Sequence, residues 1–221
     1  EKIQAVLKKY DILMIADEVI CGFGRTGNMF GTTTFGMKPD MITVAKALSS
    51  AYLPISGLMI SEEIFQALVK ESEKIGVFGH GYTYSAHPVA AAVAVETLKI
   101  YEERDVLGHV KAVSPRFVQG IKKLAQHPLV GEAQAVGLIG SIQLVKAKTP
   151  KTLFDATQPV GPFMAKRAEH HGLICRTLFG HRVALCPPLV ISDAQIDDML
   201  RRFTMALDDT AAMVNEKGLA A

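Results

Sequence analysis

The stretch ILMIADEVICGFGRTG, residues 12–27, decides the fold, because it leads from an apolar run into two acidic residues and a glycine-rich loop. Residues Ile12 to Ala16 form a short continuous apolar run, as expected of a strand buried on both faces of a sheet. Asp17 and Glu18 end this strand. The carboxylate of Asp17 is costly in such a place unless a cation meets it, whereas Glu18 is expected to be satisfied by a local partner. A cationic partner is therefore expected elsewhere in the chain.

The loop that follows contains a pattern of glycines that invites a different interpretation. Residues 22–27 match G-x-G-x-x-G, the fingerprint of dinucleotide-binding folds. That motif should open a helix whose N-terminus holds a pyrophosphate, whereas the next residues, NMFGTTT (28–34), form helix poorly. Asp17 and Glu18 would also repel phosphate. A tight glycine-rich turn is the better interpretation.

A lysine provides the expected cation. A second apolar run, Met41 to Ala45, ends at Lys46, where desolvation would disfavour the ammonium form and favour a Schiff-base nucleophile. Open α/β sheets bind ligands at the carboxyl ends of their strands, so we expect Asp17 and Lys46 to lie together there. From the residues alone, a buried structural ion pair explains the pattern at least as well as a catalytic site does.

The rest of the chain alternates strands with helices, which indicates an α/β layered sheet as far as Asp105. A third apolar run (58–60) precedes a helix capped by Ser61, and Pro88 opens a long helix to about Arg104. A smaller α+β domain is expected beyond, with helices at 106–125, 163–171 and from 193, and strands at 132–136, 138–145, 173–177 and 182–185. The sequence thus predicts two domains, residues 1–105 and 106–221.

Composition and charge exclude several classes of function. The 221 residues are 49% hydrophobic, and a net charge of +2 gives no electrostatic reason to expect nucleic acid or an anionic membrane as a partner. No apolar run reaches the ~18 residues of a membrane span. Cys21, Cys175 and Cys186 are odd in number and form no CxxC pair, which favours a reducing compartment, taken as the cytoplasm, and no metal site is expected.

Several motifs resemble those of class III aminotransferases of the ω-amino-acid or amine:pyruvate type. The stretch from 15 to 27, then KPD (38–40) and TVAK (43–46), resembles the signature of that family. The runs GHGYTYSAHP (79–88), GLICR (172–176) and CPPL (186–189) look like theirs and follow in the same order. The resemblance implies fold type I of the pyridoxal-phosphate (PLP) enzymes. It assigns residues 1–105 to the C-terminal part of a large domain with a mixed sheet, and residues 106–221 to a smaller C-terminal α+β domain.

The same resemblance implies roles for three residues of the first domain. Lys46 would form the Schiff base with PLP and then move a proton between the substrate and the cofactor. Asp17 would bind the protonated ring nitrogen and sustain the ring as an electron sink. Val19 would pack on one face of the ring, although by composition alone it could equally be core.

Further roles fall on residues that the resemblance places farther along the chain. Tyr82 and Thr83 would hold the cofactor phosphate, reaching across from the neighbouring subunit of a homodimer. Arg176 would pair with a substrate carboxylate through its planar fork of donors. Each has a structural alternative: an interface or core aromatic for Tyr82, a helix cap for Thr83 and a surface arginine for Arg176. The apolar residues Leu173, Ile174 and Leu178 around Arg176 favour a buried anchor position over a place on the surface. The polar residues His181 and Arg182 leave the pose of Arg176 open.

The expected function is transamination, in which an amine or ω-amino acid gives its nitrogen to a keto acid such as pyruvate. An ornithine-type aminotransferase, an aminomutase, a decarboxylase or a non-catalytic fragment is the alternative. The chain opens within a helix and without an initiator methionine, and it lacks the family's upstream phosphate loop and stacking aromatic residue. We therefore expect a missing N-terminal half, and an isolated piece that is inactive.

Overall fold

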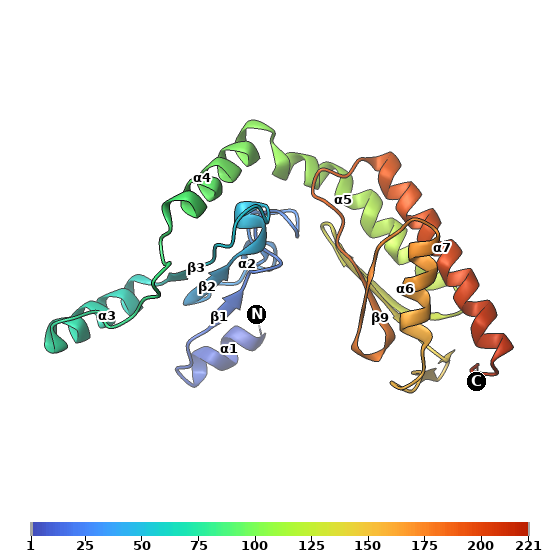
Figure 1. Ribbon diagram of the computed structural model, residues 1–221. Helices are drawn as coiled ribbons and strands as arrows, with labels where there is room; N and C mark the ends of the chain where they lie inside the picture. Colours follow the sequence, from blue (N-terminus) through green and yellow to red (C-terminus); the bar gives the residue numbers. More distant parts are fainter. Residues whose placement is uncertain (1, 221) are drawn as a thin grey trace. The chain divides into compact units, whose positions relative to one another are not determined.

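A computed structural model describes residues 2–220 of the chain. Its contacts divide the chain into two compact parts, which we call the N-terminal unit (up to residue 107) and the C-terminal unit (from residue 108) (Figure 1). Each unit has its own sheet and its own helices. No helix among residues 2–220 is both long and apolar enough to cross a membrane.

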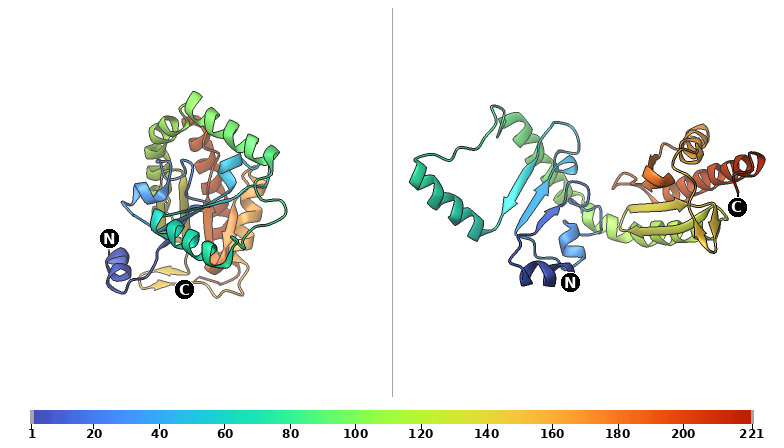
Figure 2. Two further views of the ribbon diagram at one scale, coloured as in Figure 1. Left: turned by 90° about the vertical axis from the view of Figure 1, so that its left-hand side faces the viewer. Right: turned by 90° about the horizontal axis from the view of Figure 1, so that it is seen from below.

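The N-terminal unit has a small mixed sheet with strand order β1-β2-β3 (Figure 2). Strands β1 and β2 run parallel, whereas β2 and β3 run antiparallel. Its elements are α1 (Lys2–Lys9), β1 (Ile15–Asp17), α2 (Gly31–Thr34), β2 (Met41–Val44), the 3-10 turn η1 (Lys46–Ser49), β3 (Gly57–Ile60), α3 (Glu62–Ile75) and α4 (Pro88–Glu103). The parallel pair brings the carboxyl ends of β1 and β2 to the same edge.

Local sequence explains where the helices of this unit begin and end. The hydroxyl of Ser61 accepts a hydrogen bond from the backbone N–H of Ile64 at 3.4 Å and so caps α3. Gly76, with a φ of 77°, ends the same helix in the left-handed conformation that glycine adopts most readily. Pro88 occupies the first turn of α4, where its missing N–H is not needed.

The first apolar run is not buried as the sequence suggested. Ile12, Leu13 and Ile15 are 53%, 57% and 58% exposed, and the strand covers only Ile15–Asp17. Strand β1 lies at the edge of the three-stranded sheet and pairs with β2 alone among the described residues. Ile15 and Asp17 point to one face of the sheet and are exposed, whereas Ala16 points to the other face and is buried, so only one face of this strand is covered among the described residues.

The C-terminal unit is built on a four-stranded antiparallel sheet of order β4-β5-β9-β8. The helices α5, α6 and α7 lie on one side of this sheet (Figure 1). The first helix of this unit, α5 (Val106–Lys123), begins two residues before the boundary between the units. The other elements are η2 (Leu124–Gln126), β4 (Val130–Val136), β5 (Ile139–Leu144), the small hairpin β6 (Ala147–Lys148) and β7 (Lys151–Thr152), α6 (Val160–His170), β8 (Arg176–Leu178), η3 (Phe179–His181), β9 (Arg182–Leu185) and α7 (Asp193–Glu216).

Close packing between these helices and the sheet depends on glycine. A Cβ added to Gly120 of α5 would come within 2.1 Å of Leu200 of α7, and one added to Gly140 of β5 would meet Phe117 at 3.2 Å. The side chains that fill this interior are fully buried and include Phe117, Ile121, Ile142, Leu144, Met164, Ile196 and Phe203. Burial of this kind is the main stabilising contribution to a fold.

The starts of α6 and β8 differ most from the boundaries expected in this unit. Helix α6 begins at Val160 and not at Phe163, because a proline in the first helical turn, here Pro162, displaces no intrahelical hydrogen bond. Strand β8 begins at Arg176 and not at Leu173, since it pairs with β9 only from Arg176 onward. Helix α7 begins at Asp193 as expected, with a capping box formed by Ser192 and Gln195.

Candidate active site

Asp17 is the last residue of β1, and one of its carboxylate oxygens is held by two donors. Oδ1 accepts hydrogen bonds from the backbone N–H of Val19 at 3.0 Å and from the hydroxyl of Thr43 at 3.2 Å. Thr43 lies opposite Asp17 in the parallel ladder of β1 and β2. Within residues 2–220, Oδ2 receives no hydrogen bond. The carboxylate is exposed, so its second oxygen can accept a donor from a ligand.

Lys46 follows β2 by two residues and begins the turn η1. Its side chain is exposed, and its backbone has a φ of 48°, a left-handed conformation that is unusual for a residue with a Cβ. Helix α4 packs against η1 and presents Ala90, Ala94 and Thr97 as its buried residues. The small side chains of α4 thus allow a helix to approach and support the turn that carries Lys46.

The two sequence-predicted catalytic residues leave neighbouring parallel strands at the same edge of the sheet, as expected. They are not a buried ion pair: both side chains are exposed, and among the described residues no salt bridge joins Asp17 or Lys46 to any partner. The expected desolvation of Lys46 is therefore absent from this chain by itself. The side chains of Asp17 and Lys46 are therefore accessible to a ligand and do not neutralise each other in an ion pair.

Glu18 is the buried acid of this region, with only 2% of its surface exposed. Its carboxylate accepts hydrogen bonds from the backbone N–H groups of Gly31 at 2.9 Å and Thr32 at 2.5 Å, at the start of α2. Its own N–H continues the ladder to the carbonyl of Thr43 at 3.0 Å. Glu18 therefore folds the glycine-rich loop back against the end of β1, and sequence reasoning had assigned it only an unspecified local partner.

Val19 is half-buried, and its N–H is one of the two donors to Asp17. Tyr82 and Thr83 lie in a different setting, an exposed turn that precedes α4. Tyr82 is 79% exposed, and its backbone N–H donates to the hydroxyl of Ser85 at 3.0 Å. This turn contributes no side chain to the interior of the N-terminal unit, so its aromatic and hydroxyl groups are available to a partner.

Arg176 lies in the C-terminal unit, as the first residue of the edge strand β8, and its side chain is exposed. It is not the buried anchor that one interpretation of the sequence suggested. Its neighbour Cys175 is partly buried, and burial raises the pKa of that thiol to about 11, so the thiol stays protonated. Arg176 is thus a cation on an exposed edge.

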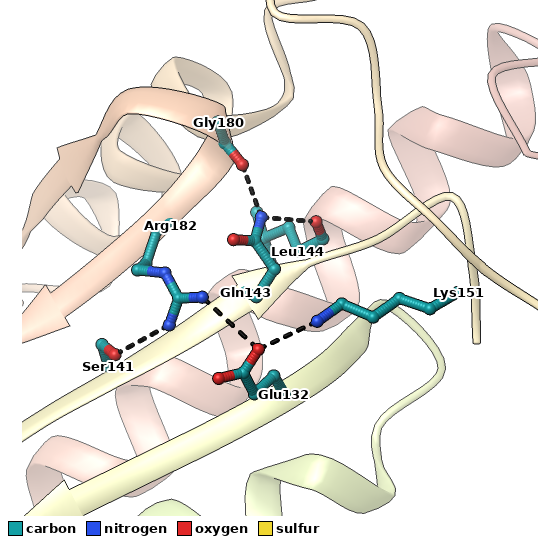
Figure 3. A network of polar contacts seen from close by, with 7 residues as sticks. All are labelled: Glu132, Ser141, Gln143, Leu144, Lys151, Gly180 and Arg182. Carbon is teal, nitrogen blue, oxygen red and sulfur yellow. Dashed lines mark hydrogen bonds and ion pairs between the residues drawn. The ribbon is translucent and has the colours of Figure 1, made fainter. Parts of the chain in front are cut away.

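Polar contacts fix the turn between β8 and β9 and account for the polar residues that left the pose of Arg176 open (Figure 3). Arg182 donates to the hydroxyl of Ser141 at 3.2 Å and to the carboxylate of Glu132 at 3.4 Å. The amide of Gln143 donates to the carbonyl of Gly180 in the same turn. These partners keep the end of the hairpin fixed, and Arg182 belongs to the network around Glu132.

His181 fixes the same turn from its other side. It is only 5% exposed, and its Nδ1 accepts a hydrogen bond from the backbone N–H of Gly161 at 3.1 Å. Its Nε2 lies 2.7 Å from the carbonyl of Asp155, so the ring is neutral and carries its proton on Nε2. Sequence reasoning had marked His181 as a polar insertion, and the tertiary contacts show that it is a buried structural residue.

Comparison with known proteins identifies the family. The sequence model of the family described as aminotransferase class-III matches residues 1–207. The chain belongs to the class-III aminotransferase family. Enzymes of this family depend on pyridoxal phosphate and have fold type I, which confirms the fold class expected from the sequence. No group of three or more metal-ligating side chains within residues 2–220 is arranged to hold a metal ion.

This class-III aminotransferase chain is similar to transaminases of several kinds. It is 44% identical over 216 residues to gamma aminobutyrate transaminase 3, chloroplastic, of Solanum lycopersicum, covering 98% of the chain and 41% of that protein. It is also 44% identical over 216 residues to the vanillin aminotransferase of Capsicum annuum, covering 98% and 47%. The omega transaminase of Pseudomonas jessenii in complex with PMP matches with a TM-score of 0.92 and 46% identity, over 97% of this chain and 47% of that one. The chain thus spans less than half the length of these relatives.

Proposed function

We propose that the protein is a pyridoxal-phosphate-dependent transaminase that moves an amino group from an amine or ω-amino acid to a keto acid such as pyruvate. One observation carries the proposal. Asp17 and Lys46 leave adjacent parallel strands at one sheet edge, exposed and without an ion pair among the described residues. A structural pair would be neutralised, whereas this pair is presented to a ligand that needs an acid and an amine together.

The residues present fit the cofactor. When bound, pyridoxal phosphate supplies an aldehyde that condenses with amines and a ring that withdraws electrons. Asp17 offers Oδ2 to the ring N–H, because Oδ1 is already occupied by Val19 and Thr43. Lys46 would attach the cofactor through Nζ, and the same Nζ would take up and return the proton that transamination moves. Val19 would pack against one face of the ring.

Two further roles extend this proposal. Tyr82 and Thr83, on the exposed turn before α4, would hold the cofactor phosphate of a neighbouring subunit, which makes the active form a homodimer or higher homo-oligomer. Arg176 would hold the carboxylate of a keto acid or amino acid, a task for which an exposed guanidinium is suited. The similarity to transaminases named for gamma aminobutyrate supports an ω-amino acid as one substrate class.

The proposed location is the cytoplasm, a reducing compartment. An odd number of cysteines without a CxxC pair supports it. The similar plant proteins include forms named for mitochondria or chloroplasts. Cell fractionation of the producing organism, followed by detection of the protein, would separate a cytoplasmic from an organellar enzyme.

Trapping of the cofactor on Lys46 tests the main proposal. The protein is purified in the form in which its organism produces it and is loaded with pyridoxal phosphate. It is then reduced with borohydride, digested and analysed by mass spectrometry. We expect the pyridoxyl mass on the peptide that contains Lys46, and none in a Lys46→Arg variant, with Lys70→Arg as the matched control. Finding the mass on Lys38 or Lys70, or no absorbance of bound cofactor, contradicts the proposal. A panel of amines, ω-amino acids and keto acids then defines the substrates.

A further inference from the structure

Thr43 occupies a place next to Asp17 that the proposed chemistry does not yet explain. Its hydroxyl donates to Oδ1 of Asp17 at 3.2 Å, and the two residues are direct partners in the parallel ladder. The other donor to Oδ1 is the backbone N–H of Val19 at 3.0 Å. Both donors therefore meet the same oxygen, and the other oxygen is left for a ligand.

The backbone of Thr43 is fixed from two sides. Its carbonyl accepts the N–H of Glu18 at 3.0 Å, and Leu58 of β3 is its partner on the other side of β2. Glu18 is in turn anchored through its buried carboxylate to the start of α2. The hydroxyl of Thr43 is consequently a donor with a fixed position, since threonine has few rotamers and its strand cannot shift alone.

A single donor would not fix the plane of the Asp17 carboxylate. The torsion that turns an aspartate carboxylate is broad, so its plane can rotate while the N–H of Val19 still meets an oxygen. A second donor from a different direction removes this freedom. It holds Oδ1 between Val19 and Thr43 and keeps Oδ2 pointed outward.

We infer that Thr43 is a positioning residue, which orients the Asp17 carboxylate so that Oδ2 meets the ring nitrogen of the bound cofactor. This inference rests on the proposed function, because it assumes that Asp17 is the partner of that nitrogen. Thr43 also lies three residues before Lys46 in the same strand-and-turn segment. The segment 43–46 would thus both orient the carboxylate of Asp17 and carry the amine of Lys46.

A double-mutant cycle in the cofactor-loaded, naturally expressed protein tests the inference. Thr43→Val keeps the shape and the strand preference but removes the hydroxyl, and Thr43→Ser restores a hydroxyl. Thr204→Val is the matched control, because the hydroxyl of Thr204 donates only within α7, to the carbonyl of Leu200 at 2.9 Å. Single-turnover rates are measured together with the absorption spectrum of the bound cofactor as a function of pH.

We expect Thr43→Val to lower the single-turnover rate about 10-fold, the scale for a hydrogen bond to a charged group, and to shift the pH at which the spectrum changes. Thr43→Ser should stay within about two-fold of the unchanged protein, and Thr204→Val should have no effect. Asp17→Asn should cost about 10²-fold or more. In the Asp17→Asn background Thr43→Val should cost nothing further, because the two residues act through one contact.

The outcomes separate the inference from the proposed function. Equal losses for Thr43→Val in both backgrounds, or a lower melting temperature with an unchanged spectrum, would show that Thr43 supports only the fold. An Asp17→Asn variant with normal rates would overturn the role of Asp17 and this inference with it. If Thr43→Val does not fold, Thr43→Ala and Thr43→Ser give the same comparison, because they differ from each other only by the hydroxyl.

Discussion

The two units of the chain differ in what they bury. Among residues 2–220, the twelve largest fully buried side chains, from Val110 to Leu207, all lie in the C-terminal unit. The strands of the N-terminal unit instead expose apolar side chains, such as Ile15 at 58% and Leu58 at 59%. Asp17 and Lys46 lie in the less buried unit. The C-terminal unit has a core of fully buried side chains. The N-terminal unit carries the proposed catalytic residues, Asp17 and Lys46, on a three-stranded sheet whose apolar side chains are partly exposed.

This contrast teaches that stability and chemistry are separable in this molecule. Substitution of an exposed site residue should change the reaction without changing the free energy of unfolding. Substitution of a core residue in the C-terminal unit should do the reverse. Four variants test this separation.

Lys46→Ala should give the largest effect. Its Nζ is proposed both to attach the cofactor and to move a proton, and the loss of a positioned proton carrier costs about 10²–10⁴-fold in rate. The melting temperature should not fall, because the side chain is exposed. Single-turnover kinetics and thermal unfolding measure both effects, with Lys70→Ala, an exposed lysine of α3, as the control. A variant that loses stability along with activity would break the comparison.

Phe117→Ala should give the largest loss of stability. This side chain is fully buried between α5 and β5, and truncation of a buried phenylalanine costs about 3–5 kcal/mol. Ile15→Ala in the N-terminal unit should cost under about 1 kcal/mol, because an isoleucine that stays 58% exposed removes little apolar surface from water on folding. Urea unfolding of the 221-residue chain measures both, and equal losses would remove the difference between the units.

Arg176→Ala should be selective among substrates. Loss of a charge-assisted pair predicts about 1.5–3 kcal/mol for keto acids and amino acids, while amines that lack a carboxylate should change little. Arg201→Ala removes another exposed arginine of the C-terminal unit and serves as the control. The measurement is kcat/KM for the two half-reactions. Similar losses for amines and acids would mean that Arg176 supports the fold.

Asp209→Asn should give the smallest effect, and one that depends on pH. Hydrogen bonds from His171 and Arg167, both at 2.7 Å, hold the pKa of the Asp209 carboxyl below its ordinary value. Because the folded pKa is lowered, this stabilisation is present above about pH 4 and is lost as the pH falls through the folded pKa. The half-exposed setting limits it to about 1 kcal/mol.

Urea midpoints at pH 7 and at pH 3 check this expectation for Asp209. The variant and the unchanged chain should differ at pH 7 and converge at low pH. Glu169→Gln on α6 is the control, as an exposed acid whose loss should leave the midpoint unchanged at both values. A difference that grows toward low pH would contradict the direction of the pKa shift.

Sequence patterns predicted those elements that local chemistry determines. Ser61 and Pro88 mark helix starts through a cap and a fixed backbone angle, and the structure confirms both starts. The last helix also begins at Asp193 as expected. The placement of Asp17 and Lys46 at one sheet edge also followed from two apolar runs and the rule for parallel strands. Such features need no knowledge of distant contacts.

The features that were missed depend on distant contacts. The apolar run at 12–16 looks the same whether one face or both faces of its strand are covered, so the exposure of Ile15 could not be predicted. The contact of Thr43 with Asp17 depends on the strand register, which no local pattern sets. The burial of His181 depends on Gly161 and Asp155, from segments 20 and 26 residues away.

The backbone of Lys46 has a further consequence, which concerns the history of such chains. A φ of 48° on a residue with a Cβ costs about 1 kcal/mol, and the exposed side chain adds no packing that would offset this cost. Selection for stability alone would therefore favour glycine or asparagine at this position. If a duplicated gene encodes a protein that no longer needs catalytic activity, the codon for this lysine is expected to be among the first to change. A glycine at this position in a related sequence would then indicate a protein without catalytic activity.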